Sequence, residues 1–269
     1  MARPTYTARL DKKICISESA QCYHFEFVID ELESFSFQAG QFISVVDNDA
    51  AGKQQTRAYS LASAANGNRF DLCVNRVQSG FFSNHLADLP VGGIVQVHGP
   101  HGHFVFQTPV VDSLLIATGT GIAPMRGIAQ WLFPQTGPEA GMDRSEGRDI
   151  WLVYGTRYPS ELYYREFFEQ IAALKPNFHY INTVSRAGEE WDGNRGYVQQ
   201  FVSHIVEQRA ARLEISPASG PPENAPPTAD INDNVKAYIC GLNNMVSAVR
   251  QTLTSFGWHR QQIIFERYD

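Results

Sequence analysis

Long hydrophobic runs are missing from this chain of 269 residues. A membrane-spanning helix needs about 18 or more consecutive apolar residues, and no stretch of the sequence reaches that length. The first residues, MARPTYTARLDKK, lead into no apolar segment of the kind that directs secretion. We therefore expect a cytoplasmic protein that does not enter a membrane.

Cysteine is scarce as well. The chain has four, and they are far apart in the sequence: Cys15, Cys22, Cys73 and Cys240. This spacing is typical of reduced thiols rather than of a disulfide framework, and it excludes the C-x4-C-x2-C pattern of a plant-type iron–sulfur centre. Any redox centre would therefore be an organic group that is bound without a covalent bond.

Positive charge is not in excess, because the formal net charge is −6. Bulk binding of nucleic acid is therefore disfavoured, although a local basic patch could still bind an acidic protein. No G-x-S-x-G or H-E-x-x-H motif nominates a hydrolase. His98, His101 and His103 lie close together, but a glycine–proline turn explains them better than zinc does, since zinc needs a closed set of ligands. We expect no metal.

Two rhythms of apolar residues are present. From Tyr6 to about Phe106, short alternating runs are separated by turn residues, which predicts an antiparallel Greek-key β-barrel with one helix near residues 83–89. From about Thr108, four buried runs are each followed by a helical stretch, and a last run ends the chain. This order favours a parallel α/β sheet. The predicted domains are residues 1–107 and 108–269, with a mobile, proline-rich surface insertion at 216–234.

Three short patterns suit nucleotides. Arg57 and Tyr59 are two residues apart in a strand, so a cation and a flat ring share one face. In LLIATGTGIAPM, a strand runs into a glycine turn that aims free backbone N–H groups at an anion. In SGFFS, Ser83 is a candidate N-cap, and Gly80 would let a ligand approach the helix start. A tight turn and a capped helix without ligand are the alternatives for the last two patterns.

Taken in order, these motifs resemble the ferredoxin–NADP(+) reductase family, and the resemblance spans nearly the whole chain. The motifs are R-x-Y-S at 57–60, G-x-x-S at 80–83, G-P-x-G-x-F at 99–104, ATGTGIAPM at 117–125, YGTR at 154–157, YICGLNNMV at 238–246 and E-x-Y at 266–268. The resemblance implies an N-terminal barrel that binds FAD and a C-terminal α/β domain that binds a nicotinamide nucleotide.

The resemblance also implies roles for residues on the flavin side. Tyr59 would stack on the flavin ring, Arg57 would neutralise the FAD pyrophosphate and Ser60 would hydrogen-bond near flavin N5. A regular pleat turns Ser60 away from Tyr59, so this role requires the strand to bend or end there. The other residues expected at FAD are Cys73, Val74, Asn75, Gly80, Phe82 and Ser83.

On the nicotinamide side, Cys240 would flank nicotinamide C4, Glu266 would support the proton network and Tyr268 would cover the other face of the flavin. Asp269 follows Tyr268, which departs from the plant-type pattern. The residues expected to hold the nucleotide are Thr120, Gly121, Arg157, Ser185, Arg186, Arg195 and Tyr197.

Ser185, Arg186 and Arg195 favour NADPH, because cations and hydroxyls suit a 2′-phosphate. NADH remains an alternative, since Glu189, Glu190 and Asp192 lie nearby. The expected activity is electron transfer between NADPH and ferredoxin or flavodoxin through hydride transfer to FAD, by a monomer. Alternatives are the NAD(P)H-dependent reductase component of a multicomponent oxygenase and a catalytically silent interaction module. Candidate cations for docking the carrier are Lys12, Lys13, Arg69 and Arg76.

Overall fold

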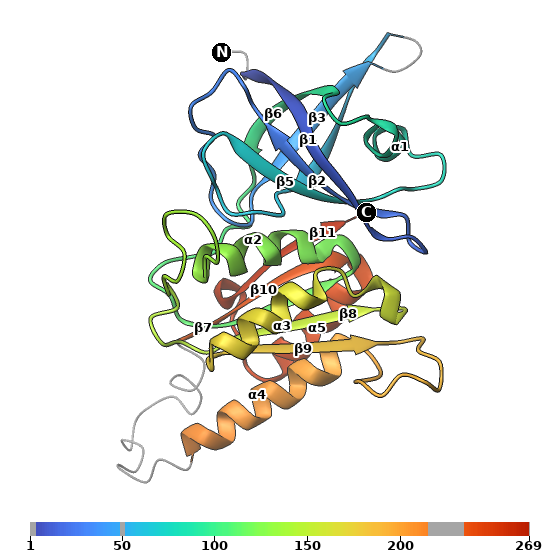
Figure 1. The fold of residues 1–269 in the computed structure, drawn as a ribbon. Helices are drawn as coiled ribbons and strands as arrows, with labels where there is room; N and C mark the ends of the chain where they lie inside the picture. The colour runs from blue at the N-terminus through green and yellow to red at the C-terminus, as the bar shows by residue number, and fades with distance from the viewer. Residues whose placement is uncertain (1–3, 49–51, 215–233, 269) are drawn as a thin grey trace. The chain divides into compact units, whose positions relative to one another are not determined.

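The computed structural model describes residues 4–48, 52–214 and 234–268 (Figure 1). Asp269 and all of the predicted insertion except Asn234 lie outside the described residues. Two compact units are present. The first contains Met1–Gln107, Thr120–Arg144 and Tyr163–Arg165, and the second contains Thr108–Gly119, Ser145–Leu162 and Glu166–Asp269. The predicted division into 1–107 and 108–269 stays a prediction.

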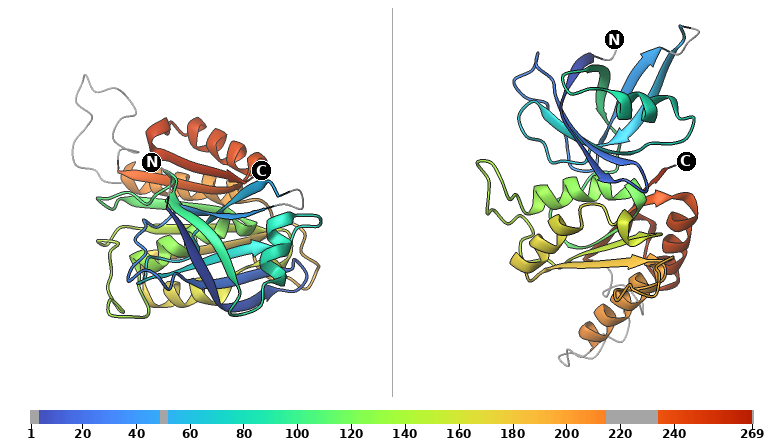
Figure 2. Two further views of the ribbon diagram at one scale, coloured as in Figure 1. Left: turned by 90° about the horizontal axis from the view of Figure 1, so that it is seen from above. Right: turned by 45° about the vertical axis from the view of Figure 1, so that its right-hand side comes forward.

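The first unit is built on a six-stranded antiparallel sheet (Figure 2). Its order is β4-β3-β6-β1-β2-β5, and an antiparallel bridge between Leu61 and Leu72 joins the chain just after β4 to β5. The strands are β1 (Thr5–Ser17), β2 (Cys22–Val28), β3 (Phe42–Asn48), β4 (Gln54–Ser60), β5 (Arg69–Asn75) and β6 (Ile94–His101). The predicted antiparallel barrel is confirmed.

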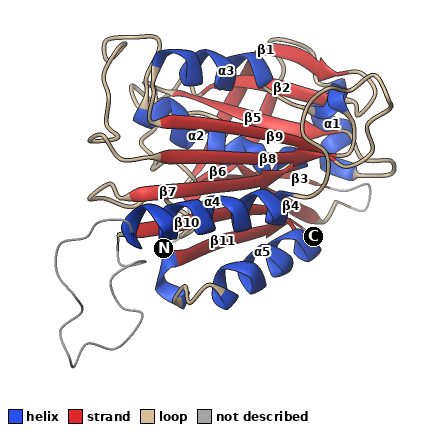
Figure 3. Cartoon of the chain, turned by 90° about the horizontal axis from the view of Figure 1, so that it is seen from below, coloured by secondary structure: helices blue, strands red, loops and turns tan. Residues whose placement is uncertain are grey.

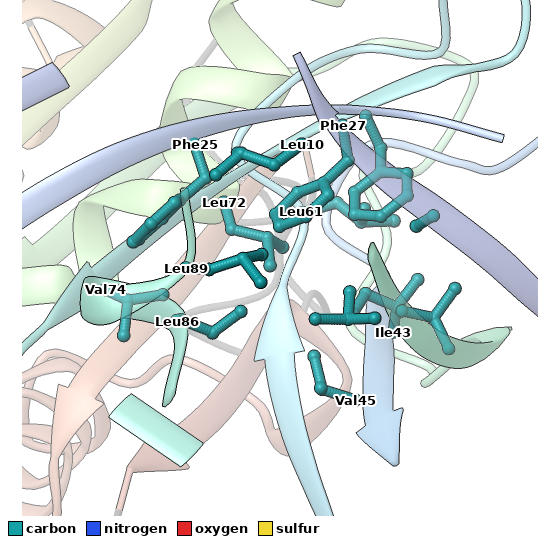
Figure 4. Packing of buried hydrophobic residues seen from close by; sticks show 14 of the residues in the cluster. Leu10, Phe25, Phe27, Ile43, Val45, Leu61, Leu72, Val74, Leu86 and Leu89 are labelled. Atoms are coloured by element: carbon teal, nitrogen blue, oxygen red, sulfur yellow. The ribbon is translucent and has the colours of Figure 1, made fainter. Parts of the chain in front are cut away.

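Alternation along the strands fills the centre of this unit. Phe25 and Phe27 of β2 point inward with Leu72 and Val74 of β5, while the residues between them point to the other face (Figure 4). Helix α1 (Phe81–Asp88) adds buried side chains to the same cluster. Each buried Leu or Phe stabilises the fold by about 1.5–3 kcal/mol. The predicted flavin residues lie on β4, β5 and α1. The core thus fixes the positions of these three elements relative to one another.

The second unit has a five-stranded parallel sheet of order β11-β10-β7-β8-β9. Helix α3 covers one face, whereas α4 and α5 pack on the other (Figure 3). The elements are β7 (Asp112–Thr118), β8 (Ile150–Thr156), α3 (Arg165–Leu174), β9 (Phe178–Val184), α4 (Val198–Glu214), β10 (Val235–Leu242), α5 (Asn243–Ser255) and β11 (Ile263–Tyr268). With α2 (Ile122–Leu132) after β7, the four predicted strand–helix pairs and the closing strand are confirmed.

The strand order reverses at β7. The chain leaves β7 for β8 on one side, while β9 and α4 lead back to β10 on the other side. Ligands of open α/β sheets bind outside the carboxyl ends of the strands at such a switch point. The ends of β7 and β10 are therefore the place where a nucleotide is expected.

Two features are absent from the described residues, 4–48, 52–214 and 234–268. No helix there is long and apolar enough to cross a membrane. No group of three or more His, Cys, Asp and Glu side chains there could hold a metal ion. His98 and His101 instead contact each other, with His98 Nδ1 2.8 Å from His101 Nε2.

Candidate active site

Strand β4 places Arg57 and Tyr59 on one face of a sheet edge. Arg57 pairs with Val45 and Tyr59 with Ile43 in the register with β3. Tyr59 packs partly against the barrel core, and burial raises the pKa of its hydroxyl to about 12, although the charge of Arg57 opposes the rise. Arg57 itself is exposed. The predicted pairing of a cation with an aromatic ring is therefore present, with the ring half-buried and the cation at the surface.

Ser60 is the last residue of β4 and is buried. The strand ends there, and Leu61 continues into the bridge with Leu72. The required strand end is thus present at Ser60. Its hydrogen bond near flavin N5 stays a prediction.

The start of α1 differs from its prediction. The N-cap is Gly80, without a side-chain cap, and Ser83 lies inside the first turn. The Ser83 hydroxyl accepts a hydrogen bond from the Val77 N–H (3.1 Å) and donates one to the Gly80 carbonyl (3.4 Å). The N-cap prediction for Ser83 is wrong, because its hydroxyl fastens the preceding turn instead. Phe82 is buried in the barrel core.

The segment of β5 expected along the flavin has two faces. Val74 points into the barrel core, so only its backbone could reach a ligand on the outer face. Asn75 accepts a hydrogen bond from the Tyr163 hydroxyl at 3.2 Å, and Cys73 lies 3.7 Å from Cys22, sulfur to sulfur. No sequence pattern indicated the contact between these two thiols, since they are 51 positions apart in the chain.

The glycine turn after β7 is a short 3-10 helix, Gly119–Gly121, that runs into α2. The Tyr154 hydroxyl lies 3.0 Å from the Gly119 carbonyl and 3.1 Å from the Glu161 carbonyl. This anchor fixes the Gly119 carbonyl and leaves N–H groups at the helix start for an anion. Thr120 is half-buried and Gly121 buried in this turn. Tyr154 was not predicted as a site residue, although the YGTR motif contained it.

A buried hydroxyl without a partner marks the switch point. In the described part of the chain, Thr118 Oγ1, at the end of β7, is buried and makes no hydrogen bond. Beside it, a Cβ atom on Gly241 would lie 2.4 Å from Thr118 Oγ1 and 2.6 Å from Met245 Cε. Glycine is therefore needed at 241 for this close approach. Thr118 was not predicted as a site residue, although the motif ATGTGIAPM at 117–125 contained it.

Three predicted residues share one face at the carboxyl edge of β10 and β11. Cys240 pairs with Glu266 in register, and Tyr268 lies two residues beyond Glu266 on the same face. Cys240 is fully buried; burial raises the pKa of its thiol, and a hydrogen bond with Tyr268 opposes the rise. The thiol therefore stays protonated at neutral pH, which suits packing and positioning better than nucleophilic attack.

Two exposed arginines lie at the ends of β8 and β9. The Arg186 N–H donates to the Arg157 carbonyl at 2.8 Å, so their backbones are joined. Among the residues that the structure describes, no carboxylate pairs with either guanidinium. Ser185 donates its hydroxyl to the Thr156 carbonyl at 3.3 Å, and Tyr197 is 63% exposed. These groups together offer two cations, a hydroxyl and a flat ring.

Arg195 is used differently. Its guanidinium donates to the carbonyls of Ala187 (3.0 Å), Gly188 (2.8 Å) and Trp191 (2.6 Å). This clamp shapes the loop that follows Ser185 and Arg186. The contact of Arg195 with a phosphate stays a prediction. The observed hydrogen bonds show that Arg195 stabilises the loop conformation.

Family comparisons agree with this geometry. Residues 7–106 match the oxidoreductase FAD-binding domain, and residues 115–251 match the oxidoreductase NAD-binding domain. The chain is therefore an oxidoreductase with a flavin-binding and a nicotinamide-nucleotide-binding domain.

Two relatives narrow the class. Ferredoxin–NADP reductase B of Sorangium cellulosum is 35% identical over 240 residues, which cover 88% of this chain and 87% of that protein. The phenol 2-monooxygenase reductase component DmpP of Pseudomonas sp. is 30% identical over 237 residues, which cover 86% of this chain but 58% of that protein. The chain belongs to the ferredoxin–NADP reductase family and is a flavin-dependent reductase.

Solved structures share the fold. Ferredoxin–NADP+ reductase from Plasmodium falciparum superposes with a TM-score of 0.74 at 19% identity, covering 98% of this chain and 96% of that one. The FAD/NAD-binding domain of nitric oxide dioxygenase from Vibrio cholerae gives 0.73 at 20% identity, covering 98% of both chains.

The residues present fit both cofactors. Arg57, Tyr59 and the start of α1 offer a cation, a ring and backbone N–H groups, which is the donor set that a flavin nucleotide needs. The unpartnered Thr118 hydroxyl and the close approach at Gly241 fit a nucleotide at the switch point.

Proposed function

We propose that this protein transfers electrons from NADPH to a small acidic carrier protein, a ferredoxin or a flavodoxin. The choice of NADPH as the coenzyme rests on the exposed guanidiniums of Arg157 and Arg186. No carboxylate among the described residues neutralises either of them. A 2′-phosphate placed there would gain charge-assisted hydrogen bonds. NADH lacks the 2′-phosphate, so its adenosine ribose offers these cations no anion.

The protein contributes position rather than reactive groups. FAD, when bound, accepts hydride from a nicotinamide and releases electrons singly. Arg57 and Tyr59 would hold it on β4, while Cys240 and Glu266 would line the nicotinamide side of the β10–β11 edge. The buried, protonated thiol of Cys240 fixes packing there, and small displacements at such a site cost much rate.

The proposed carrier site is a pair of arginines beside Phe265 of the edge strand β11: Arg267 lies on β11 and Arg250 lies on α5. The Arg250 guanidinium carbon lies 4.1 Å and that of Arg267 lies 5.2 Å from the centre of the Phe265 ring. Neither guanidinium pairs with a carboxylate in the described part of the chain. Two cations beside one ring that is 38% exposed would attract an acidic partner.

The four cations expected to dock the carrier are already engaged. Their partners are Glu26 for Lys12, the Ala87 and Leu89 carbonyls for Lys13, Asp11 for Arg69 and Asp88 for Arg76. The arginine pair beside Phe265 is therefore the stronger candidate.

The coenzyme is tested by stopped-flow reduction of the bound flavin in wild type and Arg186→Ala. We expect the variant to raise the KM for NADPH by roughly tenfold to a hundredfold and to leave the KM for NADH unchanged, because one charged hydrogen bond is worth about 1.5–3 kcal/mol. Arg148→Ala, at the opposite edge of the sheet, is the matched control. An equal effect on both coenzymes would refute the NADPH assignment.

A second acceptor class is favoured by the 30% identity to a phenol 2-monooxygenase reductase component. Titrating the reduced protein with purified ferredoxin, flavodoxin and an oxygenase component distinguishes the classes. Fast oxidation by ferredoxin or flavodoxin supports the proposal, and fast oxidation by the oxygenase component alone contradicts it.

A further inference from the structure

Two buried thiols touch in the first unit. Cys22 begins β2, Cys73 lies in β5, and their sulfur atoms are 3.7 Å apart. Since Cys73 is opposite His24 in register, the two cysteines occupy diagonal positions on the same sheet face. Cys22 is fully buried, and Cys73 keeps 6% of its surface exposed, which admits only a small reagent.

The surroundings give the two sulfurs different characters. Burial opposes ionisation of Cys73, but hydrogen bonds with Cys22 and Tyr164 and the charge of Arg126 outweigh it and lower the pKa of this thiol. Burial, followed by the hydrogen bond with Cys73, raises the pKa of Cys22. Cys73 is thus the more acidic thiol of the pair and Cys22 the less acidic one.

This polarising environment is built from fixed groups. The Arg126 guanidinium carbon lies 4.9 Å from the centre of the Tyr164 ring, and Arg126 Nη1 donates to Asp71 Oδ2 at 2.8 Å. The Tyr164 hydroxyl is 3.0 Å from His24 Nδ1. Contacts with Asp71 and His24 thus hold the cation and the hydroxyl in place beside the two sulfurs.

We propose that Cys22 and Cys73 form a reversible redox site that takes a small peroxide as its oxidant and closes to a disulfide. Neither the family comparisons nor the proposed electron transfer assigns such a site. The proposal holds whichever carrier or coenzyme the protein uses.

The chemistry balances in two steps. The Cys73 thiolate attacks one oxygen of hydrogen peroxide, the O–O bond breaks, and a sulfenic acid and hydroxide form. The Cys22 sulfur then attacks the sulfenic sulfur, the S–O bond breaks, and water leaves as the S–S bond forms. The proton that Cys73 gave up converts the hydroxide to water, so overall two thiols and one peroxide give one disulfide and two waters. For this bond to form, the sulfurs must move from 3.7 Å to about 2.05 Å apart.

The test treats the purified holoprotein with hydrogen peroxide, blocks remaining thiols with an alkylating agent in denaturant, and maps the peptides by mass spectrometry. We expect one cross-linked peptide joining Cys22 to Cys73, which a dithiol reductant converts back to two alkylatable thiols. Cys15→Ser, which removes an exposed cysteine, is the matched control and leaves the cross-link intact.

Two further variants assign the roles. In Cys22→Ser the cross-link is lost, and Cys73 is oxidised further to sulfinic and sulfonic acids, which the reductant cannot convert back to a thiol. In Tyr164→Phe the cross-link forms several-fold more slowly, because the thiolate loses a hydrogen bond. Wild-type protein in which Cys22 and Cys73 both stay alkylatable after peroxide has oxidised Cys15 would overturn the proposal, as would irreversible oxidation of Cys73 without a bond to Cys22.

Discussion

At the scale of single residues, the site depends on side chains whose neighbours decide their chemistry. Thr118 and Cys240 are ordinary residue types, and at most positions in a protein a threonine or a cysteine would contribute only to packing. At the ends of β7 and β10, the first is a buried hydroxyl without a partner in the described chain, and the second is a thiol that burial keeps protonated. Position in the sheet, rather than residue type, makes them candidates for nucleotide contact.

Gly241→Ala tests the close approach at the switch point. The new Cβ would lie 2.4 Å from Thr118 Oγ1, so we expect the variant to lose about 1–3 kcal/mol of unfolding free energy and to bind NADPH more weakly. Urea unfolding and coenzyme titration measure the two effects. The double variant Gly241→Ala with Thr118→Ala removes the clashing hydroxyl and should recover part of the stability. No recovery would contradict the assigned clash.

His24 makes stability depend on pH. Its side chain is 5% exposed, and burial, followed by the charge of Arg126, lowers its pKa to about 4. The unfolded chain takes up this proton near pH 6.5, so the free energy of unfolding falls as pH drops from about 6.5 to about 4, by up to about 3 kcal/mol. Urea unfolding at several pH values measures the slope. His24→Asn should flatten it in this window, and an unchanged slope would exclude His24 as its source.

At the scale of elements, α2 is fastened to the barrel strands of the first unit by one arginine. Arg126 donates to the Ala62 carbonyl at 2.6 Å and to Asp71 Oδ2 at 2.8 Å. Both side chains of the ion pair are largely buried, with 14% and 17% of their surface exposed. Removing one partner of a buried pair costs more than the pair contributes, because the other charge remains in the low-dielectric interior.

Arg126→Met should therefore lower the free energy of unfolding by about 3 kcal/mol, as measured by urea unfolding. Arg126→Lys keeps the charge but loses the fixed fork of the guanidinium, so an intermediate loss is expected. The double variant Arg126→Met with Asp71→Leu removes both charges and should be more stable than Arg126→Met alone. If the double variant is less stable than Arg126→Met alone, the unpaired charge of Asp71 is not the cause of the stability loss in Arg126→Met.

At the scale of the whole molecule, the net charge of −6 would repel an acidic carrier, so docking needs a local excess of cations. The arginines beside Phe265 supply one, whereas the lysines and arginines that the sequence suggested are paired within the chain.

Reversing one charge of the pair tests this docking surface. Arg267→Glu should lower kcat/KM for reduction of ferredoxin or flavodoxin by roughly tenfold at low salt and flatten its dependence on ionic strength, while reduction of ferricyanide by NADPH stays unchanged. Arg148→Glu makes the same charge change at the amino-terminal edge of the sheet and serves as the control. Equal losses in both variants would show that net charge alone matters.

The sequence by itself determined the fold class, because alternation with a period of two and strand–helix succession are local signals. It also determined the family and the choice of Arg57, Tyr59, Cys240 and Glu266 as candidates, because the order of motifs along the chain can be recognised from the sequence alone. It did not reveal that Ser83 fastens a turn instead of capping α1, because several hydroxyl positions near a helix start look alike in one dimension.

Only the tertiary structure decided which residues meet. It brought the thiols of Cys22 and Cys73 into contact on neighbouring strands, held the Gly119 carbonyl with Tyr154 and engaged Arg195 with three loop carbonyls. Each of these contacts links residues through strand register or loop shape. Register and loop shape follow from packing of the whole sheet, and no local pattern in the chain records them.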